Sequence, residues 1–172
     1  MKERVREAVF NLLGPAVTGK HAIDLFAGTG ALGFEAISRG AAGATFAERH
    51  FPTAKVIEKN AEALGIAERC TVVPANTLLW AKRLPELPAT PWVVFCSPPY
   101  ELYASHTSEM LALVEQLLRH APPGSMFAVE ADERFDFGLL PQAGEWDVRE
   151  YPPAVVGIFR MGNADARPEG RR

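Results

Sequence analysis

The chain has 172 residues, of which 48% are hydrophobic and 23% charged, and it contains 14 glycines and 14 prolines. This length and composition are typical of one globular domain with a full hydrophobic core. The formal charge of −3 argues against general affinity for nucleic acids, because phosphate binding needs a concentrated basic face, but it does not exclude a local one. No run approaches the ~18 apolar residues that cross a bilayer, and the charged start is unlike a signal peptide. We therefore expect a cytoplasmic protein without a membrane partner. We also expect it to be a monomer.

Hydrophobic periodicity predicts helices and strands that alternate along most of the chain. The helices are expected at residues 3–13, 31–39, 52–64, 77–84 and 106–120, and the strands at residues 21–26, 43–48, 69–74, 92–96, 125–130, 146–151 and 155–161. The last two strands are joined through two prolines with no helix between them, which favours an antiparallel pair at a sheet edge. We predict an α/β fold, a Rossmann-like three-layer sandwich with a mostly parallel seven-stranded sheet and an antiparallel C-terminal strand pair.

The domain organisation follows from the same pattern. Residues 1–162 are expected to form a single domain that starts with a helical segment at 1–20, and the polar residues 163–172 are expected to be disordered. Cys70 and Cys96 lie in apolar, strand-like surroundings without a C-x-x-C partner, so we expect two buried structural thiols. The four histidines share no spacing that suggests a metal site.

A glycine-rich turn follows the first predicted strand. Gly28, Gly30 and Gly33 stand at G-x-G-x-x-G spacing, Asp24 precedes them inside the strand, and Glu48 lies 20 residues after Gly28. The spacing alone fits a dinucleotide site, in which an acidic residue holds a ribose. Asp24 would repel a pyrophosphate but suits a cationic ligand, and S-adenosylmethionine carries a sulfonium and an ammonium. The alternatives are that Asp24 only caps the loop and that Glu48 is a solvated strand end.

A second motif, Ser97-Pro98-Pro99-Tyr100, ends the fourth predicted strand. Ligands of open α/β sheets bind at the carboxyl ends of strands near the switch point, which would bring this turn beside the glycine loop. The prolines hold carbonyls rigidly outward to accept hydrogen bonds from a planar amine, and Tyr100 offers a face for base stacking. The alternative is an ordinary proline turn with a core tyrosine.

Together these segments carry a family resemblance. The run DLFAGTGALGFEA, the acidic Glu48 and the P-P-Y turn resemble class I methyltransferases, and VREAVFN before the loop resembles the bacterial 16S rRNA guanine-N2 methyltransferases, over about Arg4 to Met161. The resemblance implies methyl transfer from S-adenosylmethionine to the exocyclic N2 of a guanine in ribosomal RNA or the small ribosomal subunit. The target base leaves its stack to reach the site.

The resemblance also implies a role for each site residue. The catalytic turn comprises Ser97, Pro98, Pro99 and Tyr100; the cofactor site comprises Asp24, Phe26, Gly28, Gly30, Gly33, Glu48 and Asn76; and Arg4, Arg6 and Tyr100 meet the RNA. The Ser97 side chain and the Pro98 carbonyl would accept the two N–H hydrogens of the amine, so that its lone pair faces the methyl group.

Three positions depart from the family pattern. Ser97 stands where Asp or Asn is usual, Asn76 where Asp is usual, and only residues 1–4 stand in place of an arginine-rich extension. A hydroxyl accepts hydrogen bonds less strongly than a carboxylate, so we expect slower chemistry than a Ser97→Asp variant would show. We expect Asn76 to change how adenine is held and the short start to lower RNA affinity.

Other functions remain open from the sequence. With the same cofactor, the substrate could be adenine N6 in DNA or a glutamine side-chain amide. A non-catalytic RNA-binding relative would bind the cofactor without transferring its methyl group. A nicotinamide-dependent oxidoreductase is disfavoured by Asp24 and by the proline turn.

Overall fold

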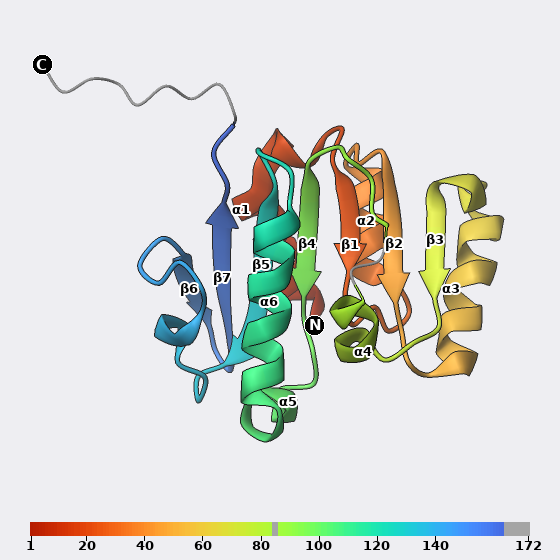
Figure 1. Cartoon of the computed structure of the whole chain (residues 1–172). Coiled ribbons are helices and arrows are strands. Elements are labelled where there is room, and N and C mark those ends of the chain that lie inside the picture. Colours follow the sequence, from red (N-terminus) through yellow and green to blue (C-terminus); the bar gives the residue numbers. More distant parts are fainter. Residues whose placement is uncertain (84–85, 164–172) are drawn as a thin grey trace, which may run out of the picture.

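A seven-stranded sheet forms the centre of the computed structural model, which describes residues 1–83 and 86–163 (Figure 1). The strands are β1 (His21–Asp24), β2 (Gly43–Ala47), β3 (Cys70–Val73), β4 (Trp92–Cys96), β5 (Met126–Asp132), β6 (Asp147–Tyr151) and β7 (Ala154–Arg160). Their order is β3-β2-β1-β4-β5-β7-β6. Strands β1 to β5 pair in parallel, and β7 pairs antiparallel with both β5 and β6. The predicted sheet and its antiparallel edge pair are confirmed.

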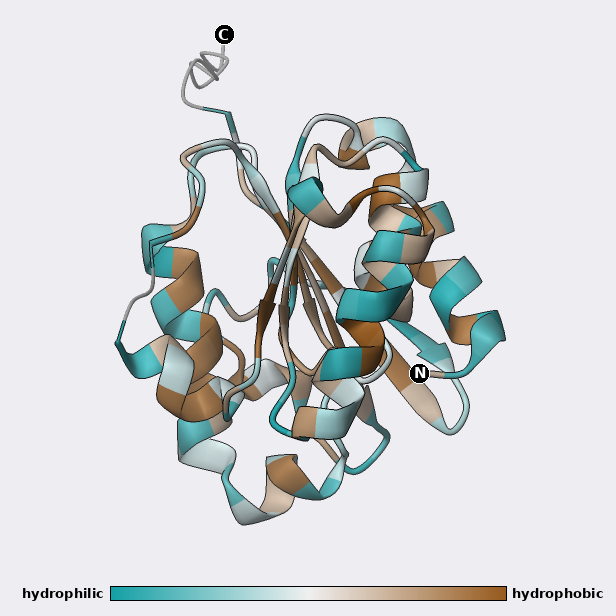
Figure 2. Cartoon of the chain, turned by 90° about the vertical axis from the view of Figure 1, so that its right-hand side faces the viewer, coloured by the Kyte–Doolittle hydropathy of each residue, from teal (hydrophilic) through white to brown (hydrophobic). Residues whose placement is uncertain are grey.

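Helices cover both faces of this sheet. The α-helices are α1 (Glu3–Leu13), α2 (Ala31–Ser38), α3 (Phe51–Ala63), α4 (Thr77–Lys82), α5 (Glu101–Ser105) and α6 (Thr107–His120), with short 3-10 turns at Gly14–Val17, Ala67–Arg69 and Phe137–Leu139. In Figure 2 the sheet is seen between two helical layers whose brown, apolar sides turn inward. Consecutive strand residues serve opposite layers: Ala22 packs with α1 and α2, and Ile23 packs with α4 and α6. Burial on both faces explains why the central strands are continuously apolar.

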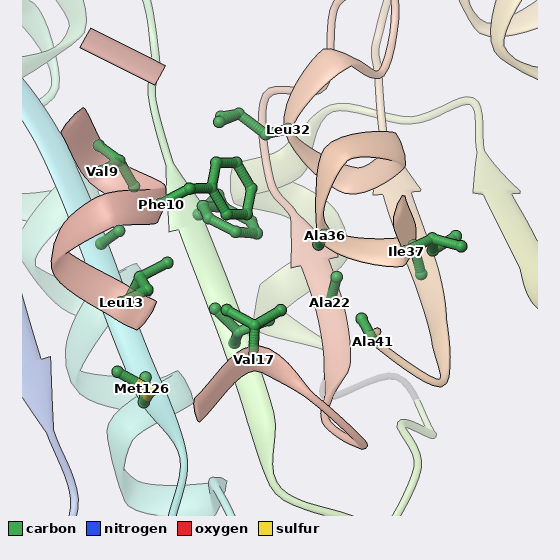
Figure 3. Close-up of a cluster of buried hydrophobic side chains, with 14 of the residues drawn as sticks. Val9, Phe10, Leu13, Val17, Ala22, Leu32, Ala36, Ile37, Ala41 and Met126 are labelled. Atoms are coloured by element: carbon green, nitrogen blue, oxygen red, sulfur yellow. The ribbon is translucent and has the colours of Figure 1, made fainter. Parts of the chain in front are cut away.

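The N-terminal helix is part of the core. Val9, Phe10 and Leu13 of α1 are buried against the sheet, and the Phe10 ring lies 5.4 Å from the ring of Phe95 in β4. Figure 3 shows these side chains gathered with Val17 and with residues of α2. Burial of such side chains contributes roughly 1.5–3 kcal/mol each, so α1 is anchored to the domain by its apolar side.

Some element boundaries differ from the sequence predictions. Helix α5 was not predicted, because its five residues are too short to show a helical period. Helix α4 ends at Lys82, and Leu84 lies outside the described residues, as do residues 164–172 of the expected disordered tail. Cys96 is buried as expected, whereas Cys70 is only half-buried because β3 is an edge strand.

Gly33 is required by packing between α2 and β2. A Cβ built on Gly33 would lie 2.3 Å from Cε1 of Phe46, which is fully buried. We expect Gly33→Ala to lower the free energy of unfolding by ~1–3 kcal/mol, measured by urea denaturation, although alanine is the better helix former. Gly162→Ala is the control, since a Cβ there meets nothing within 4 Å. Equal stability of the two variants would contradict the packing role.

Candidate active site

The carboxyl ends of the parallel strands β1 to β5 lie at one edge of the sheet (Figure 1), and the glycine loop and the proline turn follow two of these strands. The order of the strands reverses between β1 and β4, whose residues Asp24 and Phe95 are paired neighbours. Chain segments leave these two strands toward opposite layers, which opens a crevice at their carboxyl ends. The glycine loop after β1 and the proline turn after β4 therefore flank the same crevice, as predicted.

The glycine loop is held by two carboxylates. Gly28 N–H donates to Glu48 Oε2 at 2.8 Å, and Gly33 N–H donates to Asp24 Oδ2 at 3.1 Å. Gly28 and Gly30 have φ values of +56° and +89°, a conformation that favours glycine over residues with a side chain. Gly30 is the N-cap of α2. The loop is thus preorganised by the protein itself.

Asp24 lies beneath the loop, with only 1% of its surface exposed. Burial raises the pKa of Asp24 to about 7, the Gly33 N–H opposes this rise, and the neighbouring charge of Glu48 adds to it. Asp24 therefore caps the glycine loop, as one of the two interpretations of the sequence predicts. A contact of Asp24 with a cationic ligand stays a prediction.

A cavity of about 360 Å³ opens beside Glu48. Phe26, Glu48, Asn76, Leu78 and Pro99 are among its lining residues. Glu48 also accepts a hydrogen bond from His50 N–H at 2.9 Å, so its carboxylate is fixed in place. This volume and the mixture of apolar walls with a few polar groups are typical of small-molecule sites.

Asn76 has a second, structural contact. Its Oδ1 accepts hydrogen bonds from Leu78 N–H and Leu79 N–H, so it caps the N-terminus of α4. The hydroxyl of Thr77 donates to the carbonyl of Leu25, which ties α4 to the end of β1. The wall of the cavity is thereby fixed to the glycine-loop side of the site.

A second cavity, of about 390 Å³, lies over the proline turn. It is lined by all four residues of the predicted catalytic turn, by Glu130 and by others, and it shares Phe26, Glu48 and Pro99 with the first cavity. The Pro99 carbonyl accepts a hydrogen bond from Leu102 N–H at 3.0 Å. The Pro98 carbonyl is therefore the better candidate to accept a hydrogen bond from a bound amine. The two cavities therefore adjoin each other beside the proline turn.

Glu130 is a site residue that the sequence analysis missed. It lies in β5 and is 2% exposed. One of its carboxylate oxygens accepts a hydrogen bond from the Ser97 hydroxyl, and the other accepts one from the Tyr100 hydroxyl at 2.7 Å. Burial and this contact with Glu130 raise the pKa of Tyr100. The available signal was a carboxylate inside the apolar run MFAVEAD, at the end of the strand that follows the proline turn.

The predicted RNA-contacting arginines lie in α1. Arg4 is exposed and Arg6 half-buried. Met1, two residues before the helix, lines the second cavity together with the proline turn. Contact of these arginines with phosphates stays a prediction.

The described ranges 1–83 and 86–163 contain no cluster of metal-ligating side chains. Within the same ranges, no helix combines the length and hydropathy of a membrane span.

Known proteins share both the sequence and the fold. The Escherichia coli protein named Ribosomal RNA small subunit methyltransferase D is 39% identical over 172 residues, covering 97% of this chain and 80% of its own length. The solved E. coli putative methyltransferase yhhF has a TM-score of 0.77 at 25% identity, covering 94% of this chain and 87% of its own.

A Salinibacter ruber RNA methyltransferase, solved with S-adenosyl-L-homocysteine, shares the fold with a TM-score of 0.67 at 17% identity, covering 99% of this chain and 97% of its own. The family model described as Conserved hypothetical protein 95 matches residues 1–150. The chain therefore belongs to this family, with the class I methyltransferase fold that its glycine loop and proline turn indicated.

Proposed function

We propose that this protein transfers a methyl group from S-adenosylmethionine to the exocyclic N2 of a guanine in 16S ribosomal RNA. The observation that carries the proposal is the junction of the two cavities, which share Phe26, Glu48 and Pro99 at the carboxyl edge of the sheet. A donor held in the first cavity would meet an amine held on the turn. This arrangement suits group transfer better than either cavity would alone.

The first cavity fits the adenosine end of the donor. Glu48 carries carboxylate oxygens that accept hydrogen bonds from ribose hydroxyls, and Phe26 and Leu78 provide apolar walls for adenine. Bound S-adenosylmethionine would supply an electrophilic methyl group on a sulfonium. The carboxylates of Asp24 and Glu48 suit such a cation, whereas they would repel the pyrophosphate of a nicotinamide cofactor.

The turn positions the acceptor. The amine of guanine is a poor nucleophile, because its lone pair is delocalised into the ring. Ser97 Oγ and the Pro98 carbonyl would each accept one N–H hydrogen, so that the lone pair is directed at the methyl group, while Tyr100 stacks on the base. Positioning thus supplies most of the proposed catalysis.

RNA as the substrate is supported by the similarity to the E. coli protein, whose name assigns it to small-subunit ribosomal RNA. The assignment of guanine N2 as the methyl acceptor rests on the resemblance of VREAVFN and of the proline turn to that family. We propose that Arg4 and Arg6 bind phosphates at the mouth of the second cavity, and that the protein acts as a monomer in the cytoplasm.

The test is transfer of a tritiated methyl group to small ribosomal subunits and to naked 16S RNA that lack the modification. We expect label in N2-methylguanosine after nuclease digestion and chromatography. Label in N6-methyladenosine or in protein glutamine would overturn the guanine assignment. Tight cofactor binding without label in any substrate would instead identify a non-catalytic RNA-binding relative.

A further inference from the structure

We propose that Glu130 is a positioning residue for methyl transfer: it takes the hydroxyl hydrogen of Ser97, so that Ser97 Oγ presents its lone pairs to the amine, and it finally receives the proton that the amine loses. The inference rests on the proposed function and adds to it the route of the proton. It also explains how the turn operates with a serine at position 97.

The geometry of Glu130 supports this role. Its carboxylate is buried, and its two oxygens accept one hydrogen bond each from Ser97 Oγ and Tyr100 OH. The main-chain carbonyl of the same residue accepts from Tyr103 OH at 2.9 Å. Glu130, Ser97 and Tyr100 all line the cavity over the turn, where the acceptor base would bind.

The direction of the Ser97 hydrogen bond matters for the chemistry. A free serine hydroxyl can either donate or accept, and a hydroxyl that donates to the amine nitrogen would occupy the lone pair that must attack. Because Ser97 donates to a carboxylate, which only accepts, its own lone pairs remain for the amine N–H. A carboxylate partner also makes this hydrogen bond strong.

The proposed step balances as follows. The amine nitrogen forms a bond to the methyl carbon while the carbon–sulfur bond breaks, and that bond pair stays on sulfur. The methylated nitrogen then loses one proton to Ser97 Oγ, and the Ser97 hydroxyl proton passes to the Glu130 carboxylate. Water later removes the proton from Glu130. The product is an uncharged guanine that carries the methyl group on N2, and the enzyme returns to its starting state.

This arrangement reverses the expectation that Ser97→Asp would accelerate the reaction. An aspartate at position 97 would place a second carboxylate against Glu130, and two adjacent carboxylates cannot both ionise freely. In this chain a carboxylate reaches the turn from β5 and contacts the residue at position 97.

The test measures kcat for methyl transfer, the Michaelis constant for RNA and the dissociation constant of S-adenosylmethionine in four proteins besides the wild type. Glu130→Gln keeps the shape of the side chain but accepts no proton. Ser97→Asp and the double variant Ser97→Asp/Glu130→Gln relocate the carboxylate. Glu150→Gln, at an exposed position of β6, is the matched control.

We expect Glu130→Gln to lower kcat about 10- to 30-fold, with both binding constants within about twofold of the wild type. Ser97→Asp alone should also lower kcat about tenfold, and the double variant should recover to within about fivefold of the wild type. Ser97→Asp would then lower kcat in the wild type but raise it in the Glu130→Gln variant. This reversal would show that the two positions are directly coupled. Where Glu130→Gln fails to fold, the double variant and Glu130→Asp carry the same comparison.

Two other outcomes are distinguishable. If the wild type methylates RNA and Glu130→Gln matches it in kcat, or if Ser97→Asp alone is faster than the wild type, the role of Glu130 is overturned and the proposed function stands. If the wild type binds the cofactor but methylates no RNA, the proposed function fails, and the role of Glu130 fails with it.

Discussion

Asp24→Asn is expected to gain stability relative to the wild type as the pH rises. Burial raises the pKa of Asp24 from 3.8 to about 7, so between these values the native protein binds a proton that the unfolded chain has lost. The wild type therefore loses stability as the pH rises toward 7, and the asparagine variant, which does not titrate, is spared this loss. The difference in unfolding free energy between the two proteins should grow by about 2–3 kcal/mol from pH 5 to pH 8.

Urea denaturation of both proteins at several pH values measures this difference. Asparagine keeps an oxygen that can accept a hydrogen bond from Gly33 N–H. A difference in unfolding free energy that is the same at every pH therefore reflects hydrogen bonding and not charge. Asp132→Asn serves as the control, because Arg134 lowers the pKa of that carboxyl, which lies near the surface. A difference that does not change with pH would show that Asp24 does not retain its proton in the native state.

The same variant should bind S-adenosylmethionine about 10- to 100-fold more weakly at pH 7.5, because an ionised Asp24 favours a cationic ligand. Affinity of the wild type should rise from pH 5.5 to 7.5, as Asp24 loses its proton, whereas affinity of Asp24→Asn should stay nearly constant. Calorimetric titration in both proteins separates this effect from any titration of the ligand. Equal affinities would show that Asp24 only caps the loop.

Tyr100→Ala is expected to lower kcat/KM for RNA by about 10- to 100-fold. Stacking of a base on an aromatic ring contributes ~1–3 kcal/mol, and the ring lies at the cavity over the turn. Affinity for S-adenosylmethionine should change less than threefold, because Tyr100 does not line the first cavity. Methyl incorporation at varied RNA concentration gives the first quantity, and cofactor titration gives the second.

Tyr100→Phe separates the ring from the hydroxyl. It retains the stacking face and removes the hydrogen bond to Glu130. We expect phenylalanine to stay within about fivefold of the wild type. A loss as large as that of alanine would assign the effect to the hydroxyl and to Glu130, and full activity of Tyr100→Ala would exclude stacking.

The elements that could be predicted from the sequence are those with a local physical cause. The glycines at positions 28 and 30 adopt positive φ. Tolerance of this conformation is a property of glycine itself, because it has no Cβ. The continuously apolar strands predicted a sheet covered on both faces, and the missing helix between 151 and 154 predicted the antiparallel edge. Helix α5 could not be predicted from the sequence, because five residues are too few to show a helical period.

Asp24 and Gly33 illustrate the limit of motif spacing. Both were assigned to the cofactor from the glycine pattern, and the structure joins them to each other by a hydrogen bond, with Gly33 packed against Phe46. A motif residue can be required for the shape of the loop without reaching the ligand. The spacing of residues along a chain does not distinguish these two requirements.

The sequence by itself determined the fold class and identified the glycine loop and the proline turn, because each depends on residue type and on local order along the chain. Only the tertiary structure decided which groups surround Ser97. Parallel pairing of β4 with β5 brings Glu130 against a hydroxyl 33 residues earlier in the chain, and no local pattern encodes such a contact. A carboxylate of the neighbouring strand thus lies beside the turn, where only the tertiary structure could place it.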